Sequence, residues 1–285
     1  MNVNYSQRVS KRWVKHFMSG TVGELHAAVL KALPEFLHDC HIKRVQAACA
    51  ETDKADVKTD DNKAVLQVDF AENFSTFFQD EIQAAHWRKE QFTLFTCVLW
   101  QGSNCRSAIV LSDNLDHDKF SIVPFLYVVI NELVEHPSSV SLKIWSDNPS
   151  SQFKNRFIGH ALHFLGNLLK CAPTWNFFAP KHGKGPCDGI GAVNKRHVSS
   201  GIIRRQWVIN NIDDYAAASQ GTGVRIISMK QRHLEDFNDQ HNLRALFENA
   251  PPLAGISKAH CLIPDDDDHT TRLQKYSRSA SSAQS

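Results

Sequence analysis

The sequence of 285 residues has no stretch of about 18 uninterrupted apolar residues, and its first residues, MNVNYSQRVSKRW, lack the apolar core of a secretory signal. Its seven cysteines follow neither the spacing of a disulfide framework nor that of a closed four-ligand zinc site. We therefore expect an intracellular, soluble protein that folds without disulfides, without structural zinc and without a membrane partner.

A charge of one sign is also missing. The formal net charge is only +2, so the overall charge does not indicate a nucleic-acid-binding protein, and any such surface must be local. With 42% hydrophobic residues, the chain can bury one substantial core. This composition favours one main domain with smaller segments at its ends.

The composition changes along the chain and predicts five segments. Residues 1–50 carry helical spacing of apolar positions and predict a small helical lead-in. Residues 51–64 are charged and nearly free of large apolar side chains, which predicts a linker. Residues 65–206 alternate strand and helix patterns and form the expected core. A C-terminal extension, 207–275, and a disordered tail, 276–285, follow.

The core region predicts an α/β fold. Three strand patterns come first, and helices then alternate with two further strands. This order predicts a ribonuclease-H-like mixed β-sheet, three antiparallel strands then alternating α/β, with helices on both faces. The strands are expected at 65–70, 92–100, 107–111, 140–145 and 175–179, and the helices at 120–135, from a cap at 148–151 through 168, and at 187–203.

Three acids fall at the ends of separate predicted elements. Asp69 ends the first strand, Asp147 follows the fourth, and Asp188 begins the last helix. Carboxylates converging from separate elements are the ligands that Mg²⁺ prefers, and two ions about 4 Å apart support phosphoryl transfer. Each acid alone has a simpler explanation, because Asp commonly caps helices and terminates strands. Together they predict a catalytic site for two Mg²⁺ or Mn²⁺ ions.

Other polar residues lie near these acids in the sequence. Around Asp188, the segment 181–206 carries a local net charge of +5, which suits a phosphate backbone but also an ordinary solvated helix face. The candidates for DNA contact are Lys181, Lys184, Lys195, Arg196, Arg204 and Arg205. The candidates for support of the metal ligands are Glu72, Asn73, Gln152 and His182.

A second acidic cluster, SDNLDHD, contains Asp113, Asp116, His117 and Asp118. Its His-Asp pairs allow a metal-phosphohydrolase interpretation. A polar turn that caps the helix at 120–135 is the favoured alternative.

Four segments carry a resemblance to a known family: VDFAENF, EIQAAHW, IWSDNPSSQFKNRF and WNFFAPKHGKGPCDGIGAVNKR. They resemble the catalytic core of transposase-derived proteins of animal DNA transposons, within the DDE/D transposase and integrase superfamily. The resemblance covers residues 65–205. It implies a ribonuclease-H-like fold, divalent metal, and DNA strand cleavage and joining by Asp69, Asp147 and Asp188. Many relatives use glutamate as the third acid, so the shorter Asp188 requires a closer backbone, which Gly185 and Gly189 would allow.

The resemblance leaves several functions open. No zinc-finger or helix-turn-helix module precedes Val65, so the chain is either an active transposase-like nuclease in the nucleus, in a truncated or domesticated copy, or a catalytically lapsed DNA- or protein-binding domain. A structure-specific or RNA-directed nuclease on the same fold is a third possibility. DNA is the expected partner, with self-association open and no small-molecule cofactor.

Overall fold

A computed structural model describes residues 22–76, 90–179, 185–265 and 271–276. By internal contacts the chain divides into two units, 1–44 and 45–285. The second unit contains the β-sheet and all three candidate aspartates. None of the described helices is long and apolar enough to cross a membrane.

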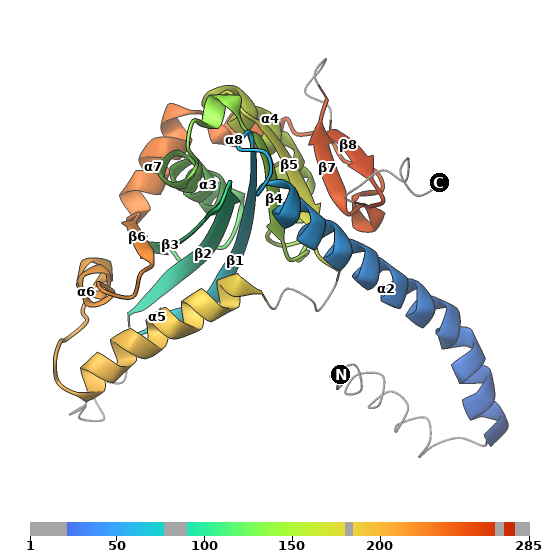
Figure 1. Cartoon of the computed structure of the whole chain (residues 1–285), viewed down its shortest axis with the longest axis horizontal. Helices are drawn as coiled ribbons and strands as arrows, with labels where there is room; N and C mark the ends of the chain where they lie inside the picture. The colour runs from blue at the N-terminus through green and yellow to red at the C-terminus, as the bar shows by residue number, and fades with distance from the viewer. Residues whose placement is uncertain (1–21, 77–89, 180–184, 266–270, 277–285) are drawn as a thin grey trace. The chain divides into compact units, whose positions relative to one another are not determined.

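The second unit is a mixed α/β structure built on one eight-stranded sheet, in the strand order β6-β3-β2-β1-β4-β5-β7-β8 (Figure 1). The first three strands pair antiparallel, and β4 and β5 then add in parallel on the other side of β1. This confirms the fold class expected from the sequence. The strands are β1 Lys63–Ser75, β2 Gln91–Gln101, β3 Asn104–Ser112, β4 Ser141–Ser146, β5 Ala172–Phe177, β6 Arg225–Ser228, β7 Cys261–Pro264 and β8 Thr271–Gln274.

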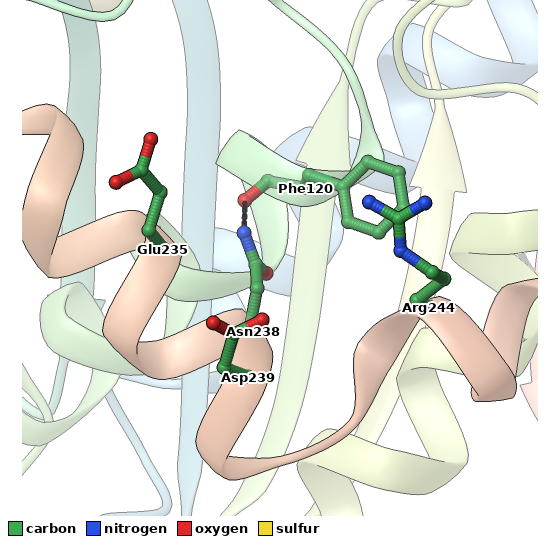
Figure 2. Close-up of a pocket in the computed structure, with 5 residues that line it drawn as sticks. All are labelled: Phe120, Glu235, Asn238, Asp239 and Arg244. Atoms are coloured by element: carbon green, nitrogen blue, oxygen red, sulfur yellow. Dashed lines mark hydrogen bonds between the residues drawn. The ribbon is translucent and has the colours of Figure 1, made fainter.

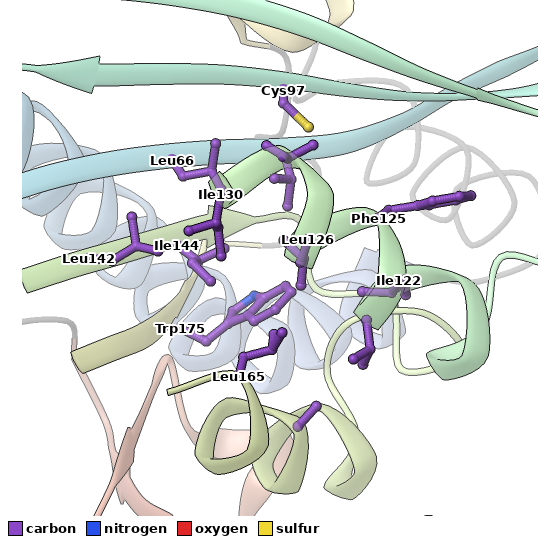
Figure 3. Packing of buried hydrophobic residues seen from close by; sticks show 14 of the residues in the cluster. Leu66, Cys97, Ile122, Phe125, Leu126, Ile130, Leu142, Ile144, Leu165 and Trp175 are labelled. Atoms are coloured by element: carbon purple, nitrogen blue, oxygen red, sulfur yellow. The ribbon is translucent and has the colours of Figure 1, made fainter. Parts of the chain in front are cut away.

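Helices cover both faces of the sheet. One face packs against α3 Lys119–Leu133, α4 Arg156–Leu169, α7 Gln231–Gln240 and α8 Leu243–Glu248. Figure 3 shows part of this core, where Trp175 and Leu165 meet Leu126 between the sheet and its helices. The other face packs against α5 Pro186–Ile203 and α6 Ile212–Ala218, and against the C-terminal end of α2 Val22–Asp56. The site described below lies on this second face.

The segment 207–275 completes the sheet. Its strand β6 pairs in parallel with β3 at one edge, while β7 pairs with β5 at the other. The polar stretch HLEDFNDQHNL, which carries no strong helical signal in the sequence, forms most of α7 and places Leu234 in the core. The expected C-terminal extension is thus built into the main sheet. The expected tail, 276–285, lies almost wholly outside the described residues.

Two local expectations differ from the structure. The cap of α4 is Asn155, whose side chain accepts a hydrogen bond from the Ile158 N–H at 3.1 Å, and not the expected segment 148–151. That segment forms its own turn, because the backbone N–H groups of Phe153 and its neighbours bond to the Pro149 carbonyl. Phe153 is fully buried, which fixes this turn against the core.

Part of the segment 51–64 is also helical, because α2 continues to Asp56. The charged end of α2 packs beside β4 because of Asp53. Its fully buried carboxylate accepts hydrogen bonds from Lys143 Nζ at 2.6 Å and from Trp145 Nε1 at 3.1 Å. One buried acid therefore fixes the end of α2 to β4.

We predict that Asp53→Ala lowers the free energy of unfolding by about 2–4 kcal/mol, because it leaves the Lys143 ammonium and the buried Trp145 N–H without an acceptor. Urea denaturation measures this change. Glu51→Ala on the same helix is the matched control, since its pair with Lys54 is at the surface and should contribute less than about 0.5 kcal/mol. Equal effects of the two substitutions would contradict the assigned role of Asp53.

Candidate active site

The alternation of side chains along β1 assigns Asp69 to one face of the sheet. Leu66 and Val68 point into the core formed with α3 and α4. Gln67 and Ala71 meet α5 on the opposite face. Since successive side chains of a strand point to opposite faces, Asp69 projects toward α5.

Asp69 does not end its strand, and the expectation that it does is wrong. β1 continues to Ser75 and pairs with β2 up to that residue. The parallel pairing of β1 with β4, however, stops at Gln67. Asp69 therefore lies just beyond the point where β4 leaves β1, and the Thr96 hydroxyl of β2 donates to its backbone carbonyl at 3.0 Å.

Helix α5 approaches β1 closely because small residues face the sheet. A Cβ added to Gly191 would lie 3.0 Å from the Ala71 Cβ and 3.3 Å from the Thr96 Cγ2. A Cβ on Gly185, at the start of the helix, would lie 2.4 Å from Gln67 Nε2.

The Cys187 thiol adds a further contact, because it donates to the Gln67 carbonyl at 3.3 Å. These contacts fix the first turn of α5, which carries Asp188. Of the two glycines expected to allow this approach, Gly185 does so; Gly189 faces open space, and Gly191 takes its place.

Asp147 directly follows β4. The Ser146 hydroxyl, which is fully buried, accepts a hydrogen bond from Trp175 Nε1 at 2.9 Å and donates to the Asp147 carbonyl at 2.7 Å. Trp145, two residues earlier, packs on the same face as Val65 and the end of α2. Ser146 and Trp175 thus fix the backbone from which the Asp147 carboxylate extends. This role of Ser146 could not be predicted from the sequence, because a serine before an acid gives no signal of its own.

The three aspartates lie within electrostatic reach of one another. Burial, followed by the negative charges of Asp147 and Asp188, raises the pKa of Asp69 from 3.8 to about 7. Burial and the charge of Asp188 likewise raise the pKa of Asp147. Both shifts mean that the folded chain disfavours a full set of negative charges at this place.

Each carboxylate has a different hydrogen-bonding state. Asp69 Oδ1 accepts from the Phe70 N–H at 2.8 Å, and Asp188 Oδ2 accepts from the Gly185 N–H at 3.2 Å, so that the exposed Asp188 caps its own helix. Asp147 Oδ1 is buried and has no hydrogen-bond partner in the described part of the chain. Within that same part, no group of three His, Cys, Asp or Glu side chains is arranged to hold a metal ion. The acids are neighbours, but they do not form a closed metal cage.

The expected supporting residues lie in different surroundings. The Glu72 side chain is 93% exposed, with its carboxylate 3.8 Å from Lys195 Nζ, which also donates to the Glu72 carbonyl at 3.0 Å. Asn73 Oδ1 is buried and unpaired among the residues described. The Gln152 N–H bonds to the Pro149 carbonyl within the turn that follows Asp147. His182 falls in the undescribed segment 180–184.

The expected DNA-contacting residues that the structure describes lie along α5 and just after it, on the C-terminal side of Asp188. Arg196 and Arg204 are exposed on the helix and its C-cap, and Arg205 follows in a left-handed conformation with φ of 57°. Lys181 and Lys184 lie outside the described residues, as does the motif EIQAAHW.

The SDNLDHD cluster is a polar turn that caps α3. The Asp118 side chain accepts from the Phe120 N–H at 2.9 Å, and Asp113 accepts from the Gln231 N–H at 2.6 Å. The His117 ring stacks on Phe70 at 4.1 Å between centroids. This confirms the turn interpretation over a metal-phosphohydrolase site.

A shallow pocket lies elsewhere, between the start of α3 and the helices α7 and α8 (Figure 2). Phe120 and Arg244 line it together with three polar residues of α7, Glu235, Asn238 and Asp239. None of the three aspartates contributes to it. The candidate site is therefore separate from this pocket and lies between β1, β4 and α5.

Comparison with known proteins gives the family. A family model described as a domain of unknown function, DUF8701, matches residues 46–277. The chain belongs to this family. No curated protein matches it.

One solved structure shows a weak likeness, the crystal structure of NurA bound to dAMP and manganese. The alignment has 9% sequence identity and a TM-score of 0.19, and it covers 79% of this chain. The chain spans about half of that structure, 47% of its length. A score this low establishes neither a shared fold nor a shared activity.

The two glycines of α5 give a matched pair of substitutions. We predict that Gly191→Val lowers the free energy of unfolding by about 1–3 kcal/mol, because the added carbons meet Ala71 and Thr96. Gly189→Ala should be neutral or stabilise by up to about 1 kcal/mol, since its Cβ meets nothing within 4 Å and alanine favours the helix. Chemical denaturation distinguishes the two, and an unaffected Gly191→Val protein would contradict the close packing of α5.

The raised pKa of Asp69 predicts a pH-dependent stability in the absence of divalent metal. Asp69 has a pKa near 3.8 in the unfolded chain and about 7 in the folded chain, so the folded state holds the proton more tightly. The free energy of unfolding therefore falls as pH rises from about 4 to 7, and it is not lowered further by this group above pH 7. Asp69→Asn should remove this decrease.

We expect Asp69→Asn to raise the free energy of unfolding at pH 8 in EDTA by about 1–3 kcal/mol, after allowance for the partial exposure of the side chain. The gain should disappear at pH 4, where the wild-type carboxyl is already protonated. Denaturation at both pH values measures it. A gain of the same size at pH 4 would show that the substitution acts through packing and not through charge.

Proposed function

We propose that the chain is a metal-dependent, transposase-like DNA nuclease or strand transferase, whose catalytic carboxylates are Asp69, Asp147 and Asp188. The observation that carries this proposal is the placement of the three acids near one another on one face of the sheet, from β1, the end of β4 and the first turn of α5, where burial and the charge of Asp188 raise the pKa of both Asp69 and Asp147. Burying acids beside other negative charges lowers the stability of a fold, and perturbed carboxylates in a cluster are typical of functional sites.

The residues present fit a divalent cation. Asp147 Oδ1 is buried and unpaired within the described chain, and a buried carboxylate oxygen without a donor is costly unless a cation or a proton satisfies it. Asp69 and Asp147 would hold Mg²⁺ or Mn²⁺ from adjacent strands, and Asp188 would join them after its side chain leaves the Gly185 N–H. Bound ions of this kind activate the attacking oxygen and stabilise the leaving oxygen of a phosphodiester.

The protein's own contribution is positioning. Thr96 and Ser146 hold the backbones of Asp69 and Asp147, and the close packing of α5 holds the third acid near them. Arg196 and Arg204 extend from the same helix and would bind the phosphates of the DNA strand. Nuclear localisation and action on chromosomal DNA belong to the same proposal.

A second candidate is a DNA- or protein-binding domain in which catalysis has lapsed. The capping role of Asp188 favours it, because the third carboxylate is engaged with its own helix and no described group of three ligands is arranged to hold a metal. The two candidates differ in whether metal-dependent cleavage accompanies binding.

The test is cleavage of supercoiled plasmid and end-labelled DNA by the full chain, with Mg²⁺, with Mn²⁺ and in EDTA. We expect metal-dependent nicking that falls by about 100-fold or more in Asp69→Asn and Asp147→Asn, because several kcal/mol of transition-state stabilisation depend on the ions that these acids hold. Asp236→Asn, an exposed acid on α7, is the control and should retain full activity.

Two outcomes would contradict the nuclease proposal. Nicking that Asp147→Asn leaves unchanged would come from another protein in the preparation. DNA binding in EDTA without cleavage in either metal would establish the lapsed binding domain instead. Parallel assays with RNA–DNA hybrid and hairpin substrates test the third possibility, a structure-specific or RNA-directed nuclease.

A further inference from the structure

The side chain of Trp207, which follows α5 in the chain, packs back on the helix at Gly201, a position where only a glycine leaves room. A Cβ added to Gly201 would lie 2.0 Å and 2.1 Å from the Cζ2 and Cε2 atoms of the indole. The indole Nε1 donates to the Val198 carbonyl at 3.1 Å. The chain reaches this position through Arg205, whose left-handed conformation turns it back over the helix. The Nε1 edge of the ring is thus held against the backbone of α5, while the residue remains partly exposed.

A second ring and two cations lie beside it. The His197 ring is 5.7 Å from the indole, centroid to centroid, with 39° between the planes, and His197 is exposed. Arg196 and Arg204 are exposed too, and neither side chain has a recorded partner among the described residues. Two aromatic rings and two cations therefore share one end of α5.

Exposed apolar side chains lie along the same helix and just beyond it. Val193, Ile203 and Val208 are 54%, 60% and 59% exposed, and only Leu115 joins them as a large exposed hydrophobic residue in the described chain. We call the whole set the α5 end surface: Val193, Arg196, His197, Ile203, Arg204, Trp207 and Val208. Figure 1 shows this end of α5 leading into the connection to α6.

The chemistry of the α5 end surface selects its partner. The α5 end surface carries Arg196 and Arg204 and no acid, so its charge is complementary to a phosphate backbone. Aromatic faces beside cations bind single-stranded nucleic acid, in which unpaired bases stack and the backbone meets positive charge. A duplex offers its phosphates to the arginines but keeps its base faces covered.

We propose that the α5 end surface binds single-stranded DNA, with Trp207 and His197 stacking on unpaired bases and Arg196 and Arg204 contacting phosphates. This inference rests on the proposed function and names its substrate as an unpaired or frayed strand. Asp188 and Gly201 are separated by 201 − 188 = 13 helical steps, which span about 20 Å. One short strand of the length bound by known single-strand sites, roughly 4–16 nucleotides, would reach from this surface to the acids.

The test is equilibrium binding by fluorescence anisotropy in EDTA, which prevents cleavage. The probes are a labelled oligothymidine of about 16 nucleotides and a duplex of the same length. We expect Trp207→Leu to weaken single-strand binding by about 5- to 100-fold, the range for loss of one stacked base, and duplex binding by less than about twofold. Trp207→Phe should restore most of the loss.

Two further variants separate stacking from charge. Arg196→Ala and Arg204→Ala should weaken both probes and each reduce the salt dependence of single-strand binding by about 0.7, whereas Trp207→Leu should leave that slope unchanged. Trp100→Leu is the matched control, because Trp100 is also partly buried but lies on β2 under the Lys54 ammonium. His197→Ala tests the surface with a side chain that is exposed and not needed for folding.

The inference is overturned if folded Trp207→Leu and His197→Ala proteins bind oligothymidine like the wild type, if the two probes weaken equally, or if the wild type binds no single strand. Cleavage together with Trp207-independent binding would retain the nuclease and remove the stacking surface. Trp207-dependent binding without any metal-dependent cleavage would retain the stacking surface and remove the nuclease.

Discussion

The close approach of α5 to the middle of the sheet is the contact on which the rest depends. Gly191 fits against Ala71 and Thr96, and Gly185 fits against Gln67, because neither carries a side chain. The same approach places Asp188 where its charge raises the pKa of Asp69 and of Asp147. A helix held even one methyl group further out would weaken that electrostatic coupling, since the interaction falls with distance. Packing and electrostatics at the site are therefore set together.

This arrangement also explains how the acids can be neighbours without forming a finished metal cage. Each carboxylate has a different environment: Asp69 accepts from its own strand, Asp188 caps its helix, and Asp147 retains an unpaired oxygen. The energetic cost falls mainly on the two partly buried acids, whereas the exposed Asp188 can exchange its cap for water. The site combines a carboxylate on β1, one directly after β4 and a third in the first turn of α5.

Much of the fold was predictable because hydrophobic patterning is a local signal. The apolar runs of β2 and of α3 fixed the type of each element, and the strand order follows from short connections and parallel pairing. The boundaries were less predictable. Asp69 was expected to end its strand because acids often do, but pairing with β2 continues past it. The stretch containing Asp53 was predicted to be a linker, because the sequence does not reveal that its carboxylate pairs with the partly exposed Lys143 and the buried Trp145.

The site was predictable only in part, for a similar reason. Acids on three separate predicted elements indicated a common site, but not the face of the sheet, the capping state of Asp188 or the function of Ser146. Gly189 and Gly191 have the same chemistry, and only the orientation of the helix about its own axis decides which one faces the sheet. Trp207 gives no signal in the sequence, because the glycine that seats it is six residues away and on a different element.

The buried carboxylate of Asp53 has a practical consequence for dissecting the molecule. A recombinant piece beginning at the first strand would contain every residue of the candidate site, yet it would uncover the Trp145 ring and deprive the neighbouring ammonium of its counter-ion. The smallest autonomous unit must therefore start well upstream of β1, inside α2, and the family match, which opens at residue 46, includes that helical end.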